Sequence, residues 1–407
     1  MYKFIDGGVC APKGFKANAV TAGIKYTNGR KDLSLIYADR PCSSAAVYTT
    51  NLVKSATISV TQKHLEDGIA QAIICNSGNA NTCNANGVEV AEAMCNLAGN
   101  ALGIDPNNIV VASTGVIGLV MPIKPVEDHI DELVKGLKAD ADHSALAWEG
   151  IHTTDTVKKE IAIEFTVGGK TCRVGGICKG SGMIHPNMAT MLGFITTDVA
   201  ITPKMIKKAL TDVVDESFNM LSIDGDTSTN DTVCVLASGT AQNPLIDSEG
   251  PLYDEFMEGF MACCKKLARA MAKDGEGATK LLVCEVLNAK TKKDAKIAAK
   301  SVICSSLFKA AMFGADANWG RALCAIGYST ANVDITKIDA EFESRKGIIP
   351  VCKNGASIPF SEEKAKEILL EDEITIRINL NDGDGYSEAF GCDLTYDYVK
   401  INGDYRS

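Results

Sequence analysis

The apolar residues of this chain follow two spacings, one typical of strands and one typical of helices. Short apolar runs bounded by turn-forming residues predict buried strands, and they lie at residues 73–74, 109–112 and 192–195. Every second residue between Ile161 and Val167 is apolar, and Gly168-Gly169 then precedes a further run at 171–174. This alternation predicts a β-hairpin that leads toward the segment around residue 190.

Apolar residues that recur at every third or fourth position predict amphipathic helices, and they lie at residues 90–101, 205–221 and 252–271. The segment 288–300, rich in Lys and Ala, is interpreted as an exposed connection or the start of a helix. The run Asp382-Gly383-Asp384-Gly385 lacks the ligand spacing of a calcium-binding loop, so it predicts a hairpin turn.

Length and composition narrow the class of protein. The chain has 407 residues, of which 46% are hydrophobic, so it can bury a large core, and its size predicts two or more lobes. A net charge of -10 opposes binding to nucleic acid, and no basic cluster with aromatic residues offsets it. The N-terminal residues 1–8 contain no apolar core of signal-peptide length, and no run along the chain approaches the about 18 apolar residues of a spanning helix. We therefore expect a cytoplasmic protein without a nucleic-acid or membrane partner.

Fifteen cysteines are scattered along the chain, and Cys263-Cys264 is the only adjacent pair. A structural zinc site requires cysteines or histidines at short, recurring spacings, which this sequence lacks. The pattern favours buried free thiols in a reducing compartment. We expect neither a metal ion nor a bound organic cofactor.

The segment from Lys179 to Gly193 is the clearest indication of chemistry, because Thr190 follows a loop with Gly and Pro and precedes an apolar run. A threonine hydroxyl is a weak nucleophile, and a free α-amine on the same residue can act as its base. Cleavage between Ala189 and Thr190 would release that amine, and the hydroxyl can itself attack the Ala189 carbonyl. A lone Ala-Thr pair would be an ordinary strand feature, and the surrounding motif favours a nucleophile. His185 is then a loop residue, since no second base is needed.

Polar loops elsewhere are candidates for the rest of a site. Thr114-Gly115 follows a predicted strand, so a hydroxyl and a backbone N–H can form an oxyanion hole there, although glycine after a strand is also an ordinary turn. The amides of the segment 75–81 are assigned to holding loops by short hydrogen bonds. The segment 274–280 lacks the order of a phosphate-binding loop. Its Glu276 is either a partner for a substrate ammonium or a solvated residue at a helix end.

Taken together, these motifs resemble the ornithine acetyltransferase (glutamate N-acetyltransferase) family of arginine biosynthesis. The similar segments occur in order over nearly the whole chain, at residues 8–15, 75–81, 114–115, 179–193, 274–280, 316–321 and 393–402. Chance agreement at so many separated motifs is not credible. Two positions depart from the family: Ser407 stands where threonine is frequent, and Ala317 stands where proline is common.

The resemblance implies self-cleavage between Ala189 and Thr190 into two chains that stay associated, commonly as an α2β2 heterotetramer. Residues 1–189 would form the α chain with the oxyanion segment. Residues 190–407 would form the β chain, which starts at the nucleophile and includes one or more further lobes. The implied fold is mixed α/β (α+β), with layered sheets and helices related to self-processing, aminopeptidase-like folds with an N-terminal nucleophile.

The resemblance also implies ping-pong acetyl transfer. N2-acetylornithine would acetylate Thr190 and leave as ornithine, and the amine of L-glutamate would then attack the ester to give N-acetylglutamate. Thr114 and Gly115 would stabilise the oxyanion in both steps, and Lys179 would bind a substrate carboxylate. The other implied substrate-binding residues are Thr154, Thr190, Glu276, Asn402 and Ser407. One sequence does not decide among Thr153, Thr154 and Thr156 for the first of these positions.

Alternatives stay open at this stage. Some family members also use acetyl-coenzyme A as a co-substrate to acetylate glutamate directly, and no residue of these motifs decides that point. An amidohydrolase or aminopeptidase with an N-terminal nucleophile would let water resolve the acyl-enzyme. An uncleaved, non-catalytic binding protein would keep the fold without turnover, an alternative that the intact Thr190, Thr114, Gly115 and Lys179 oppose.

Overall fold

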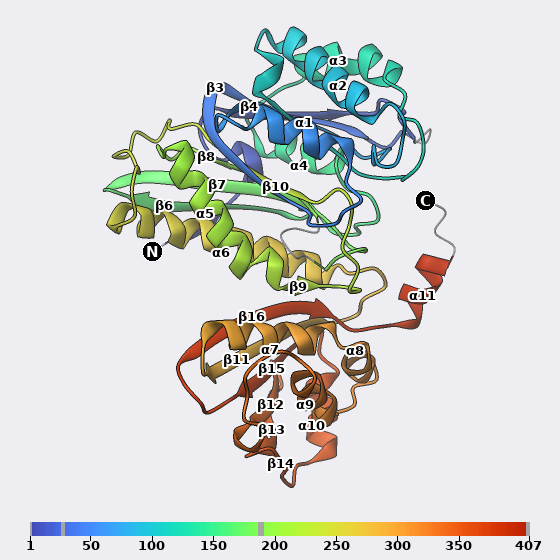
Figure 1. The fold of residues 1–407 in the computed structure, drawn as a ribbon, viewed down its shortest axis with the longest axis vertical. Helices are drawn as coiled ribbons and strands as arrows, with labels where there is room; N and C mark the ends of the chain where they lie inside the picture. Colours follow the sequence, from blue (N-terminus) through green and yellow to red (C-terminus); the bar gives the residue numbers. More distant parts are fainter. Residues whose placement is uncertain (1, 26–28, 186–190, 404–407) are drawn as a thin grey trace.

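The computed structural model describes residues 2–25, 29–185 and 191–403, and these residues form two β-sheets with helices packed around them (Figure 1). The predicted mixed α/β fold is confirmed, with 11 α-helices in the described part of the chain. The first sheet and its helices occupy the upper part of the view in Figure 1, and the second sheet with its helices lies below.

The first sheet has nine strands, and its long strand β3 joins two halves. The spatial order is β1-β6-β7-β8-β10-β3-β4-β5, with β2 also paired to β3. Along β3, residues 33–38 pair with β2, residues between 33 and 43 pair with β4, and residues 43–48 pair with β10. The strands are β1 (Lys3–Ile5), β2 (Phe15–Val20), β3 (Leu33–Tyr48), β4 (Ile69–Asn76), β5 (Ile109–Ser113), β6 (Glu160–Val167), β7 (Lys170–Lys179), β8 (Leu192–Thr197) and β10 (Thr232–Ala237).

Helices cover both faces of the first sheet. Helices α5 and α6 lie on one face, where Phe256 and Phe260 pack in a core with Phe165 of β6. On the other face α4 packs through Ala147 and Trp148. Helices α1, α2 and α3 cover β4 and β5 on the face away from α4, because the strand residues in their core alternate with those that face α4. The helices are α1 (Ala56–His64), α2 (Gly87–Leu102), α3 (Lys124–Lys135), α4 (Ala141–Glu149), α5 (Pro203–Glu216) and α6 (Pro251–Lys273).

The second sheet has seven strands in the order β14-β13-β12-β15-β11-β16-β9 and has its own core. Its strands are β9 (Leu221–Ser222), β11 (Leu281–Ala289), β12 (Asp339–Ser344), β13 (Gly347–Lys353), β14 (Ala356–Ser357), β15 (Glu373–Asn379) and β16 (Gly385–Cys392). Its helices are α7 (Lys292–Cys304), α8 (Ser306–Phe313), α9 (Trp319–Gly327) and α10 (Glu362–Leu369). The last helix, α11 (Tyr396–Gly403), follows β16 and leads back to the level between the two sheets (Figure 1).

Local chemistry accounts for several of these boundaries. Thr202 caps α5 by accepting a hydrogen bond from the N–H of Met205, and Pro203 takes the first helical position, where its missing N–H costs nothing. Gly168 and Gly169 have φ angles of 54° and 76°, so the two-residue turn between β6 and β7 adopts a conformation that favours glycine. The predicted hairpin is confirmed.

Two sequence predictions need correction. The helix predicted to reach Leu221 ends at Glu216, because the next apolar residues form a short 3-10 helix (Phe218–Met220) and then β9, which pairs with β16. The run 382–385 does not close a hairpin, because β15 and β16 lie on opposite sides of β11. Of the two interpretations of segment 288–300, the helix start is right, since α7 begins at Lys292.

The predicted cleavage point does not separate the two sheets. Strands β8 and β10 come from the chain after residue 190, yet they lie between β7 and β3, which come from the chain before it. The first sheet is therefore built from both sides of the Ala189-Thr190 bond. The second sheet is built only from residues after it.

All fifteen cysteines are free thiols and twelve of them are buried, as the sequence predicted. Burial raises the pKa of many of these thiols, for example that of Cys42 to about 12. Within the described ranges, no helix combines the length and the apolar character needed to cross a bilayer.

Candidate active site

One small cavity brings together all the predicted site residues that lie within the described ranges. Its volume is about 140 Å³, below the about 300–1,000 Å³ of pockets for drug-sized ligands. The predicted residues that line it are Thr114, Gly115, Thr154, Lys179, Glu276 and Asn402. They come from separate parts of the chain, so only the tertiary fold places them together. Ala189, Thr190 and Ser407 lie outside the described residues.

Thr114 and Gly115 form the turn after β5, and a neighbouring loop fixes its shape. The N–H of Thr114 donates to the carbonyl of Asn76 at 2.9 Å. Gly115 has a φ of 124°, and a Cβ there would lie 2.8 Å from the carbonyl carbon of Gly78, so this position favours glycine. The side chain of Asn76 accepts hydrogen bonds from the N–H groups of Gly78 and Asn79 at 3.1 and 2.9 Å. The predicted loop-holding role of segment 75–81 is confirmed.

Lys179 supplies a cation to the cavity. It is the last residue of β7, it is half-buried, and it pairs with Leu192, two residues after Thr190 in the chain. The positive charge of Lys179 stabilises the ionised form of the buried carboxyl of Asp155. Burial alone would raise the pKa of Asp155, but the charges of Lys179 and Lys159 and a hydrogen bond from the N–H of Gly180 hold that pKa well below its usual range.

A chain of hydrogen bonds places an anion in the same cavity. The hydroxyl of Thr154 donates to Glu276 Oε1 at 2.8 Å and lies 2.6 Å from the hydroxyl of Ser181. Asn402 Nδ2 of α11 donates to Glu276 Oε2 at 2.9 Å. The N–H of Glu276 also donates to the carbonyl of Ser181 at 2.7 Å. The cavity thus holds one cation and one carboxylate, as a binding site for charged amino-acid groups requires.

The start of the segment after Thr190 is anchored in the first sheet. Met191 is buried, and its carbonyl accepts a hydrogen bond from the N–H of Thr232 at 2.8 Å. Asn230, which also lines the cavity, donates from Nδ2 to the carbonyls of Ala80 and Ser113 at 2.6 and 2.7 Å. The strand β10 is thereby tied to the Thr114-Gly115 turn.

Comparison with known proteins identifies the family. The model of the ArgJ family matches residues 16–407. The chain belongs to the ArgJ family. It is 48% identical to the arginine biosynthesis bifunctional protein ArgJ 1 of Clostridium acetobutylicum, over 97% of this chain and 96% of that protein. It is 45% identical to the arginine biosynthesis bifunctional protein ArgJ of Caldanaerobacter subterraneus, over 100% of both chains.

A solved structure agrees with the assignment. The crystal structure of the arginine biosynthesis bifunctional protein ArgJ from Bacillus halodurans covers 53% of this chain and 100% of its own, with a TM-score of 0.51 and 45% identity. The predicted family is confirmed, and this ArgJ-family chain is an acyltransferase of arginine biosynthesis.

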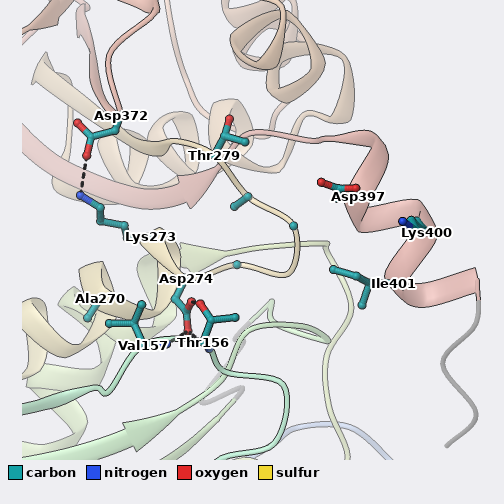
Figure 2. Close-up of a pocket in the computed structure, with 13 residues that line it drawn as sticks. Thr156, Val157, Ala270, Lys273, Asp274, Thr279, Asp372, Asp397, Lys400 and Ile401 are labelled. Atoms are coloured by element: carbon teal, nitrogen blue, oxygen red, sulfur yellow. Dashed lines mark hydrogen bonds and ion pairs between the residues drawn. The ribbon is translucent and has the colours of Figure 1, made fainter.

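The structure sets Thr156 apart from the other two threonines among which the sequence left a choice. Thr153 and Thr154 line the small cavity. Thr156 instead lines a larger cavity of about 940 Å³, whose lining also includes Gly275 and Gly277 (Figure 2). In this ArgJ-family chain Thr156 donates to Asp274 through both its N–H and its hydroxyl, so it is a structural residue of the loop.

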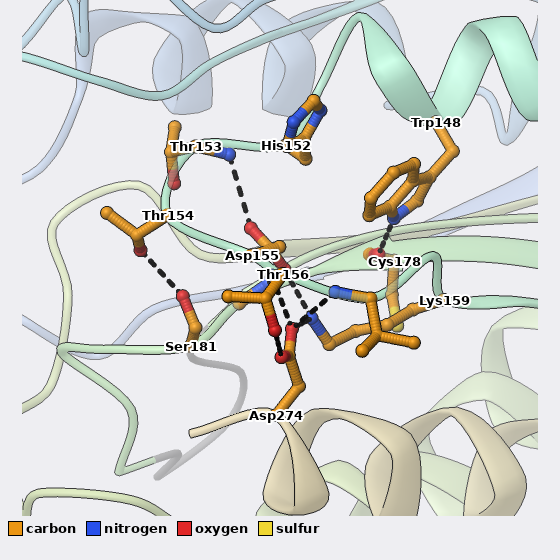
Figure 3. Close-up of polar contacts among 12 residues, drawn as sticks. Trp148, His152, Thr153, Thr154, Asp155, Thr156, Lys159, Cys178, Ser181 and Asp274 are labelled. Atoms are coloured by element: carbon orange, nitrogen blue, oxygen red, sulfur yellow. Dashed lines mark hydrogen bonds and ion pairs between the residues drawn. The ribbon is translucent and has the colours of Figure 1, made fainter. Parts of the chain in front are cut away.

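Sequence reasoning missed two groups of residues in this ArgJ-family site. The hydroxyl of Ser181 contacts Thr154, and the segment 228–230 lines the cavity. The sequence indicated them only by polar side chains, beside glycines for Ser181 and before a strand for 228–230. Lys159 with Asp155 and Asp274 forms a buried ionic cluster beside the site (Figure 3). No spacing pattern in the sequence indicated it.

His185 takes no part in the lining of the cavity. Its Nδ1 lies 3.1 Å from the hydroxyl of Ser222. Burial, together with the nearby charge of Lys300, lowers the pKa of His185 to about 4. The imidazole is therefore neutral at physiological pH, as a packed loop residue would be.

Proposed function

We propose that this chain transfers an acetyl group from N2-acetylornithine to L-glutamate through an acetyl ester of Thr190. The observation that supports this proposal is the meeting of an oxyanion turn, Thr114-Gly115, with Lys179 and Glu276 in one small cavity. Such a cavity offers donors for a developing oxyanion and opposite charges for an amino acid.

In the first half-reaction, the hydroxyl of Thr190 adds to the acetyl carbonyl carbon of N2-acetylornithine, and the α-amine of Thr190 takes the hydroxyl proton. The hydroxyl of Thr114 and the N–H of Gly115 stabilise the resulting oxyanion. The C–N bond then breaks, and ornithine leaves with the proton on its amine. The acetyl group remains as an ester on Thr190.

In the second half-reaction, the neutral amine of glutamate attacks the ester carbonyl in the same oxyanion turn. The C–O bond to Thr190 breaks, the threonine oxygen takes back a proton, and N-acetylglutamate leaves. Covalent catalysis divides one difficult amide exchange into two easier steps. Each step uses the same two donors, Thr114 and Gly115.

The charges of the cavity suggest how the two substrates are bound. Both substrates carry an α-carboxylate, which we assign to Lys179. The side-chain ammonium of N2-acetylornithine is assigned to Glu276, which Thr154 and Asn402 hold in place. Ser407 is carried over from the family resemblance as a further substrate contact.

The processing and assembly of the chain are part of the proposal. Thr190 attacks the carbonyl of Ala189, the bond is cut, and residues 1–189 and 190–407 stay together, with two copies forming an α2β2 heterotetramer in the cytoplasm. Both sequence relatives are named bifunctional, which supports acetyl-coenzyme A as a second acetyl donor to Thr190.

The test uses the purified protein with glutamate and either N2-acetylornithine or acetyl-coenzyme A. We would follow N-acetylglutamate and the mass of the chain that contains Thr190. Product from N2-acetylornithine, with an acetyl adduct on Thr190 when glutamate is omitted, supports the proposal. Free acetate without N-acetylglutamate would indicate a hydrolase, and a single uncleaved chain without turnover would indicate a binding protein.

A further inference from the structure

A lysine with no access to solvent lies beside the cavity. Lys159 precedes β6, its side chain is fully buried, and its Nζ donates to Asp155 Oδ1 at 2.6 Å and to Asp274 Oδ2 at 2.5 Å (Figure 3). A buried ammonium group is tolerated only when it is paired and hydrogen-bonded. Lys159 is thus the cation that keeps two buried carboxylates together.

Asp155 connects this lysine to the cation of the cavity. Its Oδ1 accepts the N–H of Gly180 at 2.7 Å, directly after Lys179. Its Oδ2 accepts the N–H of Thr153 at 3.2 Å. The same carboxylate therefore fixes the end of β7 and the loop that carries Thr154.

Asp274 connects the lysine to the anion of the cavity. It accepts the N–H groups of Thr156 and Val157 at 3.0 and 3.3 Å, and it lies two residues before Glu276 at the end of α6. Without Lys159, the carboxylates of Asp155 and Asp274 would lose the ammonium group that pairs with both of them. Either the segments that carry them would move apart, or one carboxylate would take up a proton.

We propose that Lys159 is a positioning residue that holds Lys179, Thr154 and Glu276 at the spacing that a charged amino-acid substrate requires. This inference rests on the proposed function, because the substrate roles of those residues belong to it. The hydrogen bonds of Lys159, Asp155 and Asp274 do not reach Thr114 or Gly115, whose turn is held by Asn76. Disturbing the cluster should therefore affect substrate binding more than the chemical step.

The test compares two variants of the cluster with a matched control in the processed enzyme. Lys159→Met removes the cation, and Asp274→Asn removes one carboxylate while it keeps the pair between Lys159 and Asp155. The control is Arg377→Met in the second sheet, which also removes a cation from between carboxylates, those of Glu285, Glu341 and Glu343 at 3.1, 2.8 and 2.7 Å.

Both cluster variants should raise the KM for N2-acetylornithine tenfold to a hundredfold, on the order of one lost charged hydrogen bond. The kcat should stay within about threefold, because the substrate contacts act equally in the ground state and the transition state. Arg377→Met should leave KM unchanged. Equilibrium binding of ornithine to each protein should weaken by the same factor as KM rises.

Several outcomes would overturn the positioning role. An Asp274→Asn variant with unchanged KM for N2-acetylornithine and unchanged ornithine affinity would overturn it. A rise in KM in Arg377→Met equal to that in the cluster variants would overturn it as well. If Lys159→Met does not fold, Asp274→Asn decides, and failure of Asp274→Asn to fold would assign the cluster to stability alone. If the wild-type protein binds ornithine but transfers no acetyl group, the proposed function fails, and the ornithine affinities still decide the positioning role.

Discussion

Replacing Glu276 by Gln should weaken the use of the acetyl donor and leave the acceptor nearly unaffected. The side chain keeps its size and one carbonyl oxygen, but it loses the negative charge that we assign to the side-chain ammonium of N2-acetylornithine. Glutamate has no ammonium at that end of the molecule and carries a carboxylate instead. The charge of Glu276 therefore favours one substrate only.

The size of the effect follows from the contacts of Glu276. One hydrogen bond from Thr154 and one from Asn402 already occupy its two oxygens, at 2.8 and 2.9 Å, and the residue is half-buried. A hydrogen bond between charged groups contributes about 1.5–3 kcal/mol, and partial exposure places this one at the lower end. Since about 1.4 kcal/mol corresponds to a factor of ten, kcat/KM for N2-acetylornithine should fall roughly tenfold to thirtyfold.

Ping-pong kinetics allow the two substrates to be assayed separately, because kcat/KM for each substrate reports only its own half-reaction. The kcat/KM for glutamate should not fall and should rise by at most about threefold, because the change removes a like charge from near the side-chain carboxylate of that substrate while Glu276 is partly exposed. Asp397→Asn is the matched control, since Asp397 lies on α11 and lines only the larger cavity. Equal losses for donor and acceptor would refute the assignment of Glu276 to the donor ammonium.

Three further predictions concern the nucleophile, the oxyanion turn and pH. Thr190→Ala should abolish both self-cleavage and transfer, and a processed, active variant on a denaturing gel would reject the nucleophile assignment. Thr114→Ala should lower kcat on the order of a hundredfold, as loss of one oxyanion donor does elsewhere, with an unchanged melting temperature as the control. Burial lowers the pKa of folded His185 to about 4, while the unfolded value is about 6.5. The unfolded state therefore binds a proton first as the pH falls, and the folded protein loses stability between these values. His185→Gln should lose on the order of 1 kcal/mol less over this interval, after a discount for partial exposure. Equal losses in melting temperature for the wild-type protein and His185→Gln between about pH 7 and 5 would contradict the role of His185 in this pH dependence.

Part of the candidate site could be predicted from the sequence because several of the predicted residues lie in short polar loops that follow or precede an apolar run. The turn at Thr114-Gly115 and the loop around Glu276 are of this kind, and the structure places both in one cavity. What the sequence could not give is the distance between such loops, because the cavity joins segments as far apart as residues 114 and 402.

The wrong helix boundary and the missed lysine both have physical reasons. The apolar positions of the predicted helix 205–221 continue beyond its true end at Glu216. Phe218 and Leu221 are buried as parts of the following 3-10 helix and of β9. Burial alone does not distinguish the last turn of a helix from the first residues of a strand. Lys159 could not be singled out, because one of its two partners, Asp274, lies 115 residues away in the chain and a single lysine forms no pattern.

The position of β8 and β10 between β7 and β3 has a consequence for how the cleaved protein would refold. Once the bond before Thr190 is cut as proposed, the new chain would begin next to a strand that is hydrogen-bonded on both sides. The first folding event involves one polypeptide, but any later refolding would need two fragments to find each other and interleave their strands. The uncleaved precursor could therefore reach the native fold at any dilution. The cleaved protein, once unfolded, would regain the native fold only when its two fragments meet, so its refolding would depend on concentration.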